Sequence, residues 1–317
     1  MTSSPPPLVL IVGPTAVGKT AVAIRLARRL DGEIVSADSR LFYRGMDIGT
    51  AKPGLHERQE VPHHLIDVVA PDQTLSLAAF QSLARQAIAA IQSRGRLALL
   101  VGGTGQYVRA VTEAWTPPAV APDPRLRQAL EEMKAERGAA WLHARLRALD
   151  PAAAESIDPR NTRRAIRALE VILSTGHRFS GQRGRGEPPY RLISVGLIRP
   201  RAELYARLDA RIEAMFAAGL LEEVRGLLAQ GYGPELPAMS AIGYRECVQV
   251  LRGAMTVEQA KAAMRRATRI YVRRQANWFR ASDPTIRWFE ASDPGLEASL
   301  AAYIRDRLDG QAGSAGA

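Results

Sequence analysis

Residues 8–20 read LVLIVGPTAVGKT, and this stretch decides the fold. An apolar run with the length of a buried strand leads directly into the pattern G-x-x-x-x-G-K-T, which is complete at residues 13–20. Between a strand and a helix, the glycines let backbone N–H groups surround phosphate oxygens, and the N-terminus of the helix adds positive potential. The pattern therefore predicts binding of a diphosphate-bearing ligand or a nucleotide such as ATP at Gly13, Pro14, Thr15, Ala16, Val17, Gly18, Lys19 and Thr20.

The last two side chains of this loop have separate expected roles. Lys19 would neutralise phosphate charge, and the Thr20 hydroxyl is the expected ligand of Mg²⁺. The sequence lacks two features of ordinary nucleotide hydrolases: a strand ending in a magnesium-binding carboxylate followed by a glycine switch, and an Asn/Thr-Lys-x-Asp motif. The loop thus indicates phosphate binding and does not by itself indicate nucleoside triphosphate hydrolysis.

Further apolar runs occupy 33–37, 97–101 and 190–198, and helical patterns separate most of them. Strands interleaved with helices favour a parallel, doubly wound sheet. The segment 116–189 departs from this alternation, because a proline-rich stretch opens it, Arg- and Ala-rich helices follow, and a glycine-arginine loop closes it. The predicted fold class is α/β, a P-loop NTPase-like doubly wound parallel sheet core with an inserted small α-helical subdomain.

These patterns also set the expected boundaries. The core would comprise 8–115 and 190–309 with C-terminal helices, the insertion 116–189, and two disordered tails 1–7 and 310–317.

Two C-terminal helices have sequence signals for their ends. A helix at 201–219 is expected to end at Gly219, and a longer one is expected to begin after Thr256, with Gln259 as its capping-box partner. One face of the longer helix would carry Arg266, Arg269, Arg273 and Arg280, and the opposite face Met264, Ala267, Tyr271 and Trp278.

Composition excludes several protein classes. The chain has 317 residues, 46% of them hydrophobic and 24% charged, which is typical of a globular protein and atypical of a disordered, collagenous or coiled-coil chain. Its one cysteine, Cys247, cannot form an intramolecular disulfide, and no leader or run of 18 apolar residues occurs. We therefore expect a cytoplasmic protein that does not enter membranes.

The positive charge is concentrated in two segments. The net charge is +11, yet residues 160–191 carry +6, residues 261–280 carry +7 without a single acid, and the rest of the chain carries −2. A GC-rich genome would explain the preference for Arg over Lys, but it would not cluster the charge. The clustering predicts a surface that binds a polyanion such as RNA.

Seven stretches together resemble one family. They are GPTAVGKT (13–20), ADSRLFYRGMDIGTAKP (37–53), VPHHLID (61–67), LLVGGTGQY (99–107), RRAIRALEV (163–171), SAIGYRE (240–246) and TRIYVRRQANWFR (268–280). In this order they resemble the bacterial-type tRNA dimethylallyltransferases, also called tRNA isopentenyltransferases. The resemblance implies transfer of a dimethylallyl group from dimethylallyl diphosphate, with Mg²⁺, to N6 of the adenosine 3′-adjacent to the anticodon.

The reaction implied by the resemblance gives roles to several residues. Asp38 follows the second strand, and a carboxylate there would accept the proton of the weakly nucleophilic adenine amine; otherwise Asp38 merely caps a helix. Lys19 and, by resemblance, Thr104 and Arg211 would stabilise charge on the leaving diphosphate. Taken alone, Thr104 would be part of a tight turn and Arg211 a surface arginine.

The anticodon stem-loop of tRNA is the expected partner of the basic segments. The base end of the site is assigned to Asp38, Ser39, Arg40 and Leu41, and the remaining tRNA contacts to Arg163, Arg164, Arg167, Gly243, Tyr244, Arg245, Arg266, Arg269, Arg273, Arg274 and Gln275. Two positions depart from the usual family pattern: Leu41 stands where many members have Gln, and Val272-Arg273 stands for Ala-Lys.

Two other interpretations remain open at this point. A P-loop small-molecule kinase would use Lys19 and Mg²⁺ on ATP, and an RNA-binding module would use a nucleotide only as a switch. Neither requires the stretch 37–53. We further expect a monomer without a stable protein partner, and structural rather than metal-binding roles for His63 and His64, which lack ligand companions at suitable spacing.

Overall fold

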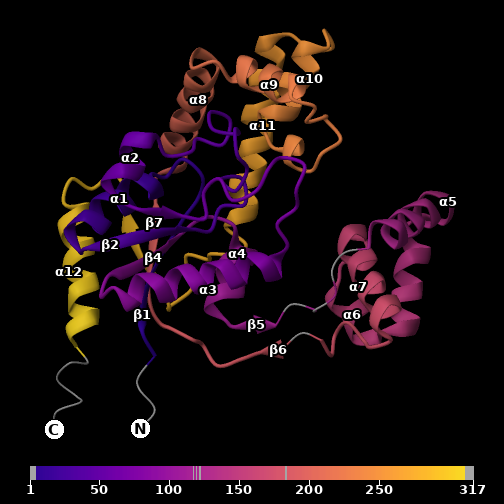
Figure 1. Ribbon diagram of the computed structural model, residues 1–317, viewed down its shortest axis with the longest axis horizontal. Coiled ribbons are helices and arrows are strands. Elements are labelled where there is room, and N and C mark those ends of the chain that lie inside the picture. Colours follow the sequence, from indigo (N-terminus) through magenta and orange to yellow (C-terminus); the bar gives the residue numbers. More distant parts are fainter. Residues whose placement is uncertain (1–4, 117, 119, 121–122, 183, 311–317) are drawn as a thin grey trace. The chain divides into compact units, whose positions relative to one another are not determined.

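The computed structural model describes residues 5–116, 118, 120, 123–182 and 184–310. The chain divides into two compact units, one formed by Met1–Thr112 with Pro189–Ala317 and the other by Glu113–Pro188 (Figure 1). The expected tails lie largely outside the described residues, except that Pro7 already belongs to a strand.

The first unit is built on a six-stranded sheet of the order β3-β2-β4-β1-β7-β8, with every neighbouring pair parallel. Its strands are β1 (Pro7–Val12), β2 (Gly32–Ser36), β3 (His63–His64), β4 (Leu97–Val101), β7 (Arg191–Ile198) and β8 (Arg287–Glu290). The four longer strands were expected from their apolar runs. The strands β3 and β8 were not, because two residues at an edge, or four that include Arg and Glu, carry no apolar run.

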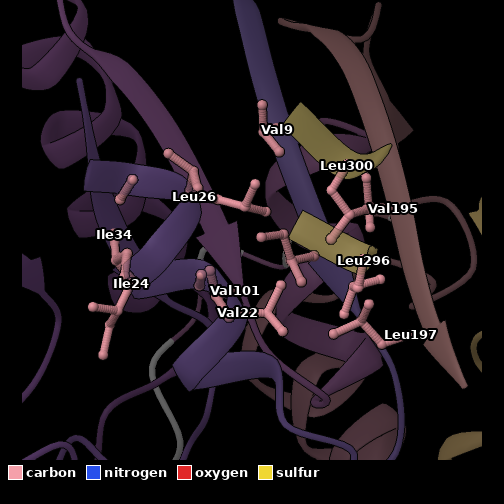
Figure 2. Close-up of a cluster of buried hydrophobic side chains, with 14 of the residues drawn as sticks. Val9, Val22, Ile24, Leu26, Ile34, Val101, Val195, Leu197, Leu296 and Leu300 are labelled. Atoms are coloured by element: carbon pink, nitrogen blue, oxygen red, sulfur yellow. The ribbon is translucent and has the colours of Figure 1, made fainter. Parts of the chain in front are cut away.

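Helices cover both faces of the sheet. They are α1 (Lys19–Arg29), α3 (Leu77–Ser93), α4 (Gly105–Thr112), α8 (Arg201–Ala217) and α12 (Leu296–Asp309), while the short helix α2 (Leu55–Glu60) has no buried residue. In β1, Val9 and Ile11 pack on α1, α8 and α12, while the alternate residues Leu8 and Leu10 pack on α3 and α4. Figure 2 shows the first of these clusters, where Leu26 and Leu300 approach Val9 and Val195. This two-sided core confirms the predicted doubly wound fold class.

A helical layer extends the first unit. It contains α8, α9 (Leu220–Ala229), α10 (Tyr244–Leu251) and α11 (Val257–Gln275) around a core of its own. The predicted capping box is confirmed: Gln259 N–H donates to Thr256 Oγ1 over 3.2 Å, and Thr256 N–H donates to Gln259 Oε1 over 2.8 Å. The expected end of α8 is displaced, because its C-cap is Ala218 and Gly219 (φ 95°) forms the N-cap of α9.

The second unit is mostly helical. It contains α5 (Pro124–Leu149), α6 (Pro151–Ser156), α7 (Thr162–Thr175) and an antiparallel pair of β5 (Trp115–Thr116) with β6 (Gly184–Arg185). The buried carboxylate of Glu170 organises one end by accepting bonds from Asp123 N–H, Arg127 and Arg167 over 2.6–2.9 Å. Within the described parts of both units, no helix has the length and apolar character needed to cross a membrane.

Candidate active site at the phosphate loop

The loop between β1 and α1 has a fixed, partly strained backbone. Gly13 has φ 149°, and a Cβ atom there would lie 2.6 Å from the Leu197 carbonyl oxygen, so only glycine fits. Ala16 adopts φ 66°, a left-handed conformation that side-chain-bearing residues adopt at some cost. The loop ends at Gly18, which is the N-cap of α1, so the first N–H groups of that helix face the loop.

Lys19 closes the loop onto itself. Its Nζ donates to the carbonyl oxygens of Gly13 and Pro14, each over 2.9 Å. Burial lowers the pKa of Lys19 to about 8; the charge of Asp38 acts in the opposite direction, and Arg211 lowers the pKa further. The amine is therefore mostly protonated at neutral pH, and it loses its charge as the pH rises through about 8.

Two arginines that the sequence analysis did not single out hold the loop from outside. Arg207 of α8 donates through Nε to the Ala16 carbonyl over 3.0 Å, and Arg199, just before α8, donates to the Val17 carbonyl over 3.0 Å. Nothing in the sequence marks these two among 39 arginines, because the contacts join segments more than 180 residues apart.

Asp38 lies where the end of β2 leads into the site. One carboxylate oxygen, Oδ1, accepts the Arg40 N–H over 3.0 Å, so Asp38 stabilises a local turn and does not form the helix cap that the alternative interpretation expected. Its negative charge also raises the pKa of Lys19 and that of Arg211, which places all three groups in one electrostatic cluster. The turn and the cluster are compatible, because Oδ2 is not used by the turn.

Thr104 immediately precedes α4, and its hydroxyl is a candidate contact for a ligand oxygen. Its backbone carbonyl accepts the N–H groups of Tyr107 and Val108, which fixes the residue at the head of the helix. Its Oγ1 atom is buried and has no partner in good hydrogen-bond geometry among the described residues, although the Tyr271 hydroxyl interacts with it. A buried hydroxyl without a well-placed partner costs free energy, so a ligand oxygen here would be favoured.

Tyr271 of α11 joins this cluster, although its helix face was expected only to pack. Burial chiefly, and then the Asp38 charge, raises the pKa of its phenol, while Thr104, Arg40 and Gln275 act in the opposite direction. Tyr271 therefore lies among the proposed catalytic groups. Helical periodicity alone cannot distinguish a core tyrosine from one facing a site.

The loop of residues 46–50, within the family-like stretch, is held by a single carboxylate. Glu223 of α9 accepts the N–H groups of Asp47, Ile48 and Gly49 over 2.8–3.3 Å and the Tyr244 hydroxyl over 2.6 Å. Burial and the Glu223 carboxylate raise the pKa of Tyr244, which keeps the phenol protonated as a donor. Glu223 itself carried no functional signal in the sequence, although its partners lie in the family-like stretches 37–53 and 240–246.

Some arginines of the stretch 261–280 form ion pairs with acids of α8, and others form none. Arg269 donates to Asp209 of α8 over 2.8 Å and lies 4.9 Å above the Tyr205 ring, and Arg265 pairs with Glu213. Thus α8 supplies acids to the stretch 261–280, which has none of its own, and Arg280 falls beyond the end of the helix. By contrast, the expected tRNA-contact residues Arg266, Arg273 and Arg274 are exposed and form no ion pair within the described residues.

The other residues expected to contact tRNA include both buried and exposed ones. Tyr244 is wholly buried, Gly243 forms the backbone N-cap of α10, and Gln275 is 4% exposed, so the side chains of Tyr244 and Gln275 are covered in the chain without RNA. Arg245 is exposed beside Glu246.

Near Asp38, Arg40 donates to the Pro237 carbonyl over 3.3 Å, and Ser39 and Leu41 are half-buried. In the second unit, Arg163 and Arg164 are exposed, whereas Arg167 is bound to Glu170 and to the Val120 carbonyl.

The paired histidines have structural partners. His64 Nε2 lies 2.7 Å from the buried Glu33 carboxylate, and His63 Nδ1 lies 2.7 Å from the Val61 carbonyl. Burial lowers the pKa of His63, which keeps the ring neutral. No group of three His, Cys, Asp or Glu side chains suited to a metal occurs in the described part of the chain.

The fold and this cluster define an α/β protein with a phosphate loop and a carboxylate beside it. Residues 41–282 match the family model described as IPP transferase. A tRNA dimethylallyltransferase of Roseiflexus sp. (strain RS-1) is 54% identical over 303 residues, which cover 96% of this chain and 99% of the relative. The chain belongs to the IPP transferase family and is a prenyltransferase.

Solved structures agree with this assignment. The full-length tRNA isopentenylpyrophosphate transferase of Bacillus halodurans is 40% identical with a TM-score of 0.73, covering 98% of this chain and 99% of that one. A eukaryotic dimethylallyltransferase acting on tRNA, 24% identical with a TM-score of 0.78, covers 96% of this chain and 80% of its own and shares the fold.

Proposed function

We propose that this enzyme transfers a dimethylallyl group from dimethylallyl diphosphate to N6 of the adenosine 3′-adjacent to the anticodon of tRNA. The observation that carries the proposal is the cluster of Lys19, Arg211 and Asp38 at a phosphate loop, in a chain of this family. Two cations suit a leaving diphosphate, and one carboxylate suits a proton acceptor. The roles of the individual residues are part of this proposal.

The leaving group is stabilised by fixed charges and donors. As the allylic C–O bond breaks, its electron pair departs with the diphosphate, whose developing charge is met by Lys19, Arg211 and N–H groups of the loop. The buried Thr104 hydroxyl donates to the diphosphate oxygen nearest the allylic carbon. Because these groups are already in place, little reorganisation accompanies bond breaking.

Mg²⁺ fits the donor set at the head of α1. Thr20 exposes its hydroxyl there, and Mg²⁺ is usually held by one or two protein oxygens together with substrate phosphates. When bound, the ion would neutralise part of the diphosphate charge.

The acceptor amine is activated by Asp38. The N6 lone pair forms the new C–N bond, and the proton lost from N6 passes to the Asp38 carboxylate. The Arg40 N–H fixes Oδ1 of that carboxylate, which leaves Oδ2 to take the proton.

Transfer itself is the test of the reaction. Radiolabelled dimethylallyl diphosphate and γ-labelled ATP are offered in parallel reactions with an anticodon stem-loop that has adenosine 3′ of the anticodon. We expect label in the RNA from the allylic diphosphate only, and no label when that adenosine is replaced by guanosine. Label from ATP, as a kinase predicts, or RNA binding without product, would refute the proposal.

Binding of the stem-loop is assigned to exposed arginines. On α11 these are Arg266, Arg273 and Arg274; in the second unit they are Arg163 and Arg164 at the start of α7. Guanidinium groups without acidic partners release counterions from RNA when they bind phosphate. We also expect a cytoplasmic monomer, since the acceptor is tRNA and the lone Cys247 is buried.

Salt dependence should separate free arginines from paired ones. Arg266→Ala and Arg273→Ala should each weaken stem-loop binding and reduce the slope of log K against log salt by about one unit. Arg269→Ala is the matched comparison, because its guanidinium already pairs with Asp209, and its slope should stay near the wild-type value. Fluorescence anisotropy at several salt concentrations measures all three; equal slopes for Arg266→Ala and wild type would contradict the assignment.

A further inference from the structure

Gln275, the last residue of α11, reaches into the phosphate loop. Its side-chain Oε1 accepts the Thr15 N–H over 2.8 Å and the Thr15 hydroxyl over 3.1 Å. Its Nε2 donates to the Gly103 carbonyl over 3.2 Å. The carboxamide therefore joins the loop to the turn before α4, and it is buried while doing so.

The position of Thr15 within the loop makes this contact unusual. In such loops the backbone N–H groups surround the α- and β-phosphates, and the lysine reaches towards the β- and γ-phosphates. In this protein Lys19 points back to the Gly13 and Pro14 carbonyls. Because the lysine reaches the phosphates farthest along the chain of a nucleotide, a third phosphate would extend towards this start of the loop. The Thr15 N–H lies at the start of the loop and already donates to Gln275 Oε1.

The carboxamide packs closely on the turn before α4. A Cβ atom on Gly103 would lie 2.2 Å from Gln275 Nε2, so a larger residue at position 103 would displace the end of the Gln275 side chain. Three residues further on, Trp278 packs against Gly105, and Arg109 donates to the Trp278 carbonyl over 3.2 Å. The end of α11 is therefore anchored on the same turn.

We propose that Gln275 determines specificity by closing the phosphate loop behind the second phosphate, so that the site accepts a diphosphate and excludes a triphosphate. The inference rests on the proposed function, for which dimethylallyl diphosphate is the donor. It gives Gln275 a role other than the expected contact with tRNA, and it would keep ATP out of a loop with a full G-x-x-x-x-G-K-T pattern.

Inorganic anions test the inference without an allyl group or RNA. Diphosphate and tripolyphosphate are titrated into the full-length protein with Mg²⁺ by isothermal calorimetry. Wild type should bind diphosphate at least about tenfold more tightly, since the third phosphate meets a filled position and gains no N–H donor. In Gln275→Ala the ratio should fall towards one, because the freed Thr15 N–H becomes available to the third phosphate.

Two further variants control for a merely structural role. Gln275→Glu keeps an oxygen at the Thr15 N–H and adds negative charge, so the preference for diphosphate should persist although both anions bind less tightly. Asn277→Ala, an exposed neighbour, should keep the wild-type ratio. Equal affinities in wild type, or an unchanged ratio in Gln275→Ala, would overturn the inference. Absence of prenylated RNA with a normal wild-type ratio would instead count against the proposed function alone.

Discussion

Asp38→Asn should slow dimethylallyl transfer by about 10²- to 10⁴-fold in single-turnover experiments while tRNA affinity stays near the wild-type value. The amide oxygen of asparagine can still accept the Arg40 N–H, so the turn is preserved, but the side chain cannot take the proton from N6. Quenched-flow measurement with excess enzyme isolates the chemical step from product release.

Asp38→Ala provides the comparison, since it removes both the proton acceptor and the turn contact. If Asp38 acts as the base, the asparagine and alanine variants should be similarly slow. If Asp38 only stabilises the turn, asparagine should restore most of the rate, and a single-turnover rate within a few-fold of wild type would refute its assignment as base.

Glu223→Ala should lower the free energy of unfolding by about 3 kcal/mol, because it leaves three backbone N–H groups of residues 47–49 and the Tyr244 hydroxyl without their acceptor. Charge-assisted bonds to several donors at once are stronger than an exposed ion pair. Urea denaturation followed by circular dichroism measures the change.

Glu222→Ala is the matched control one residue away. Glu222 is exposed, and its one ion pair within the described part of the chain is with Arg225, over 3.4 Å, so its removal should change the free energy of unfolding by less than about 0.5 kcal/mol. Equal destabilisation by the two variants would show that helix propensity or net charge, rather than the loop contact, accounts for the effect of Glu223.

The parts of the molecule that the sequence predicts are those set by neighbouring residues. The phosphate loop and the capping box at Thr256 depend on spacings of a few residues, and the longer strands on continuous apolar runs. Local spacing also places Asp38 at the end of a strand. These features need no knowledge of which segments meet in space.

The rest of the site depends on contacts that span the chain. Gln275 meets Thr15 across 260 positions, and Arg269 meets Asp209 across 60. The arginine-rich stretch 261–280 contains no acid and therefore looked free, although Asp209 and Glu213 of α8 neutralise part of it. The family resemblance indicated Thr104 and Arg211, but only the tertiary structure shows the buried Thr104 hydroxyl and adds Tyr271 to the cluster.

The contacts of Arg199, Arg207 and Gln275 with the phosphate loop have a thermodynamic consequence. They are made within the protein itself, so the loop has its binding shape before any diphosphate arrives, and the donor loses little affinity to the ordering of that loop. In the proposed reaction the main entropic cost then falls on the RNA, whose adenosine would have to leave its stack to reach the Asp38 carboxylate. The small substrate would meet a site that is already formed, and the large substrate is the one that would have to adapt.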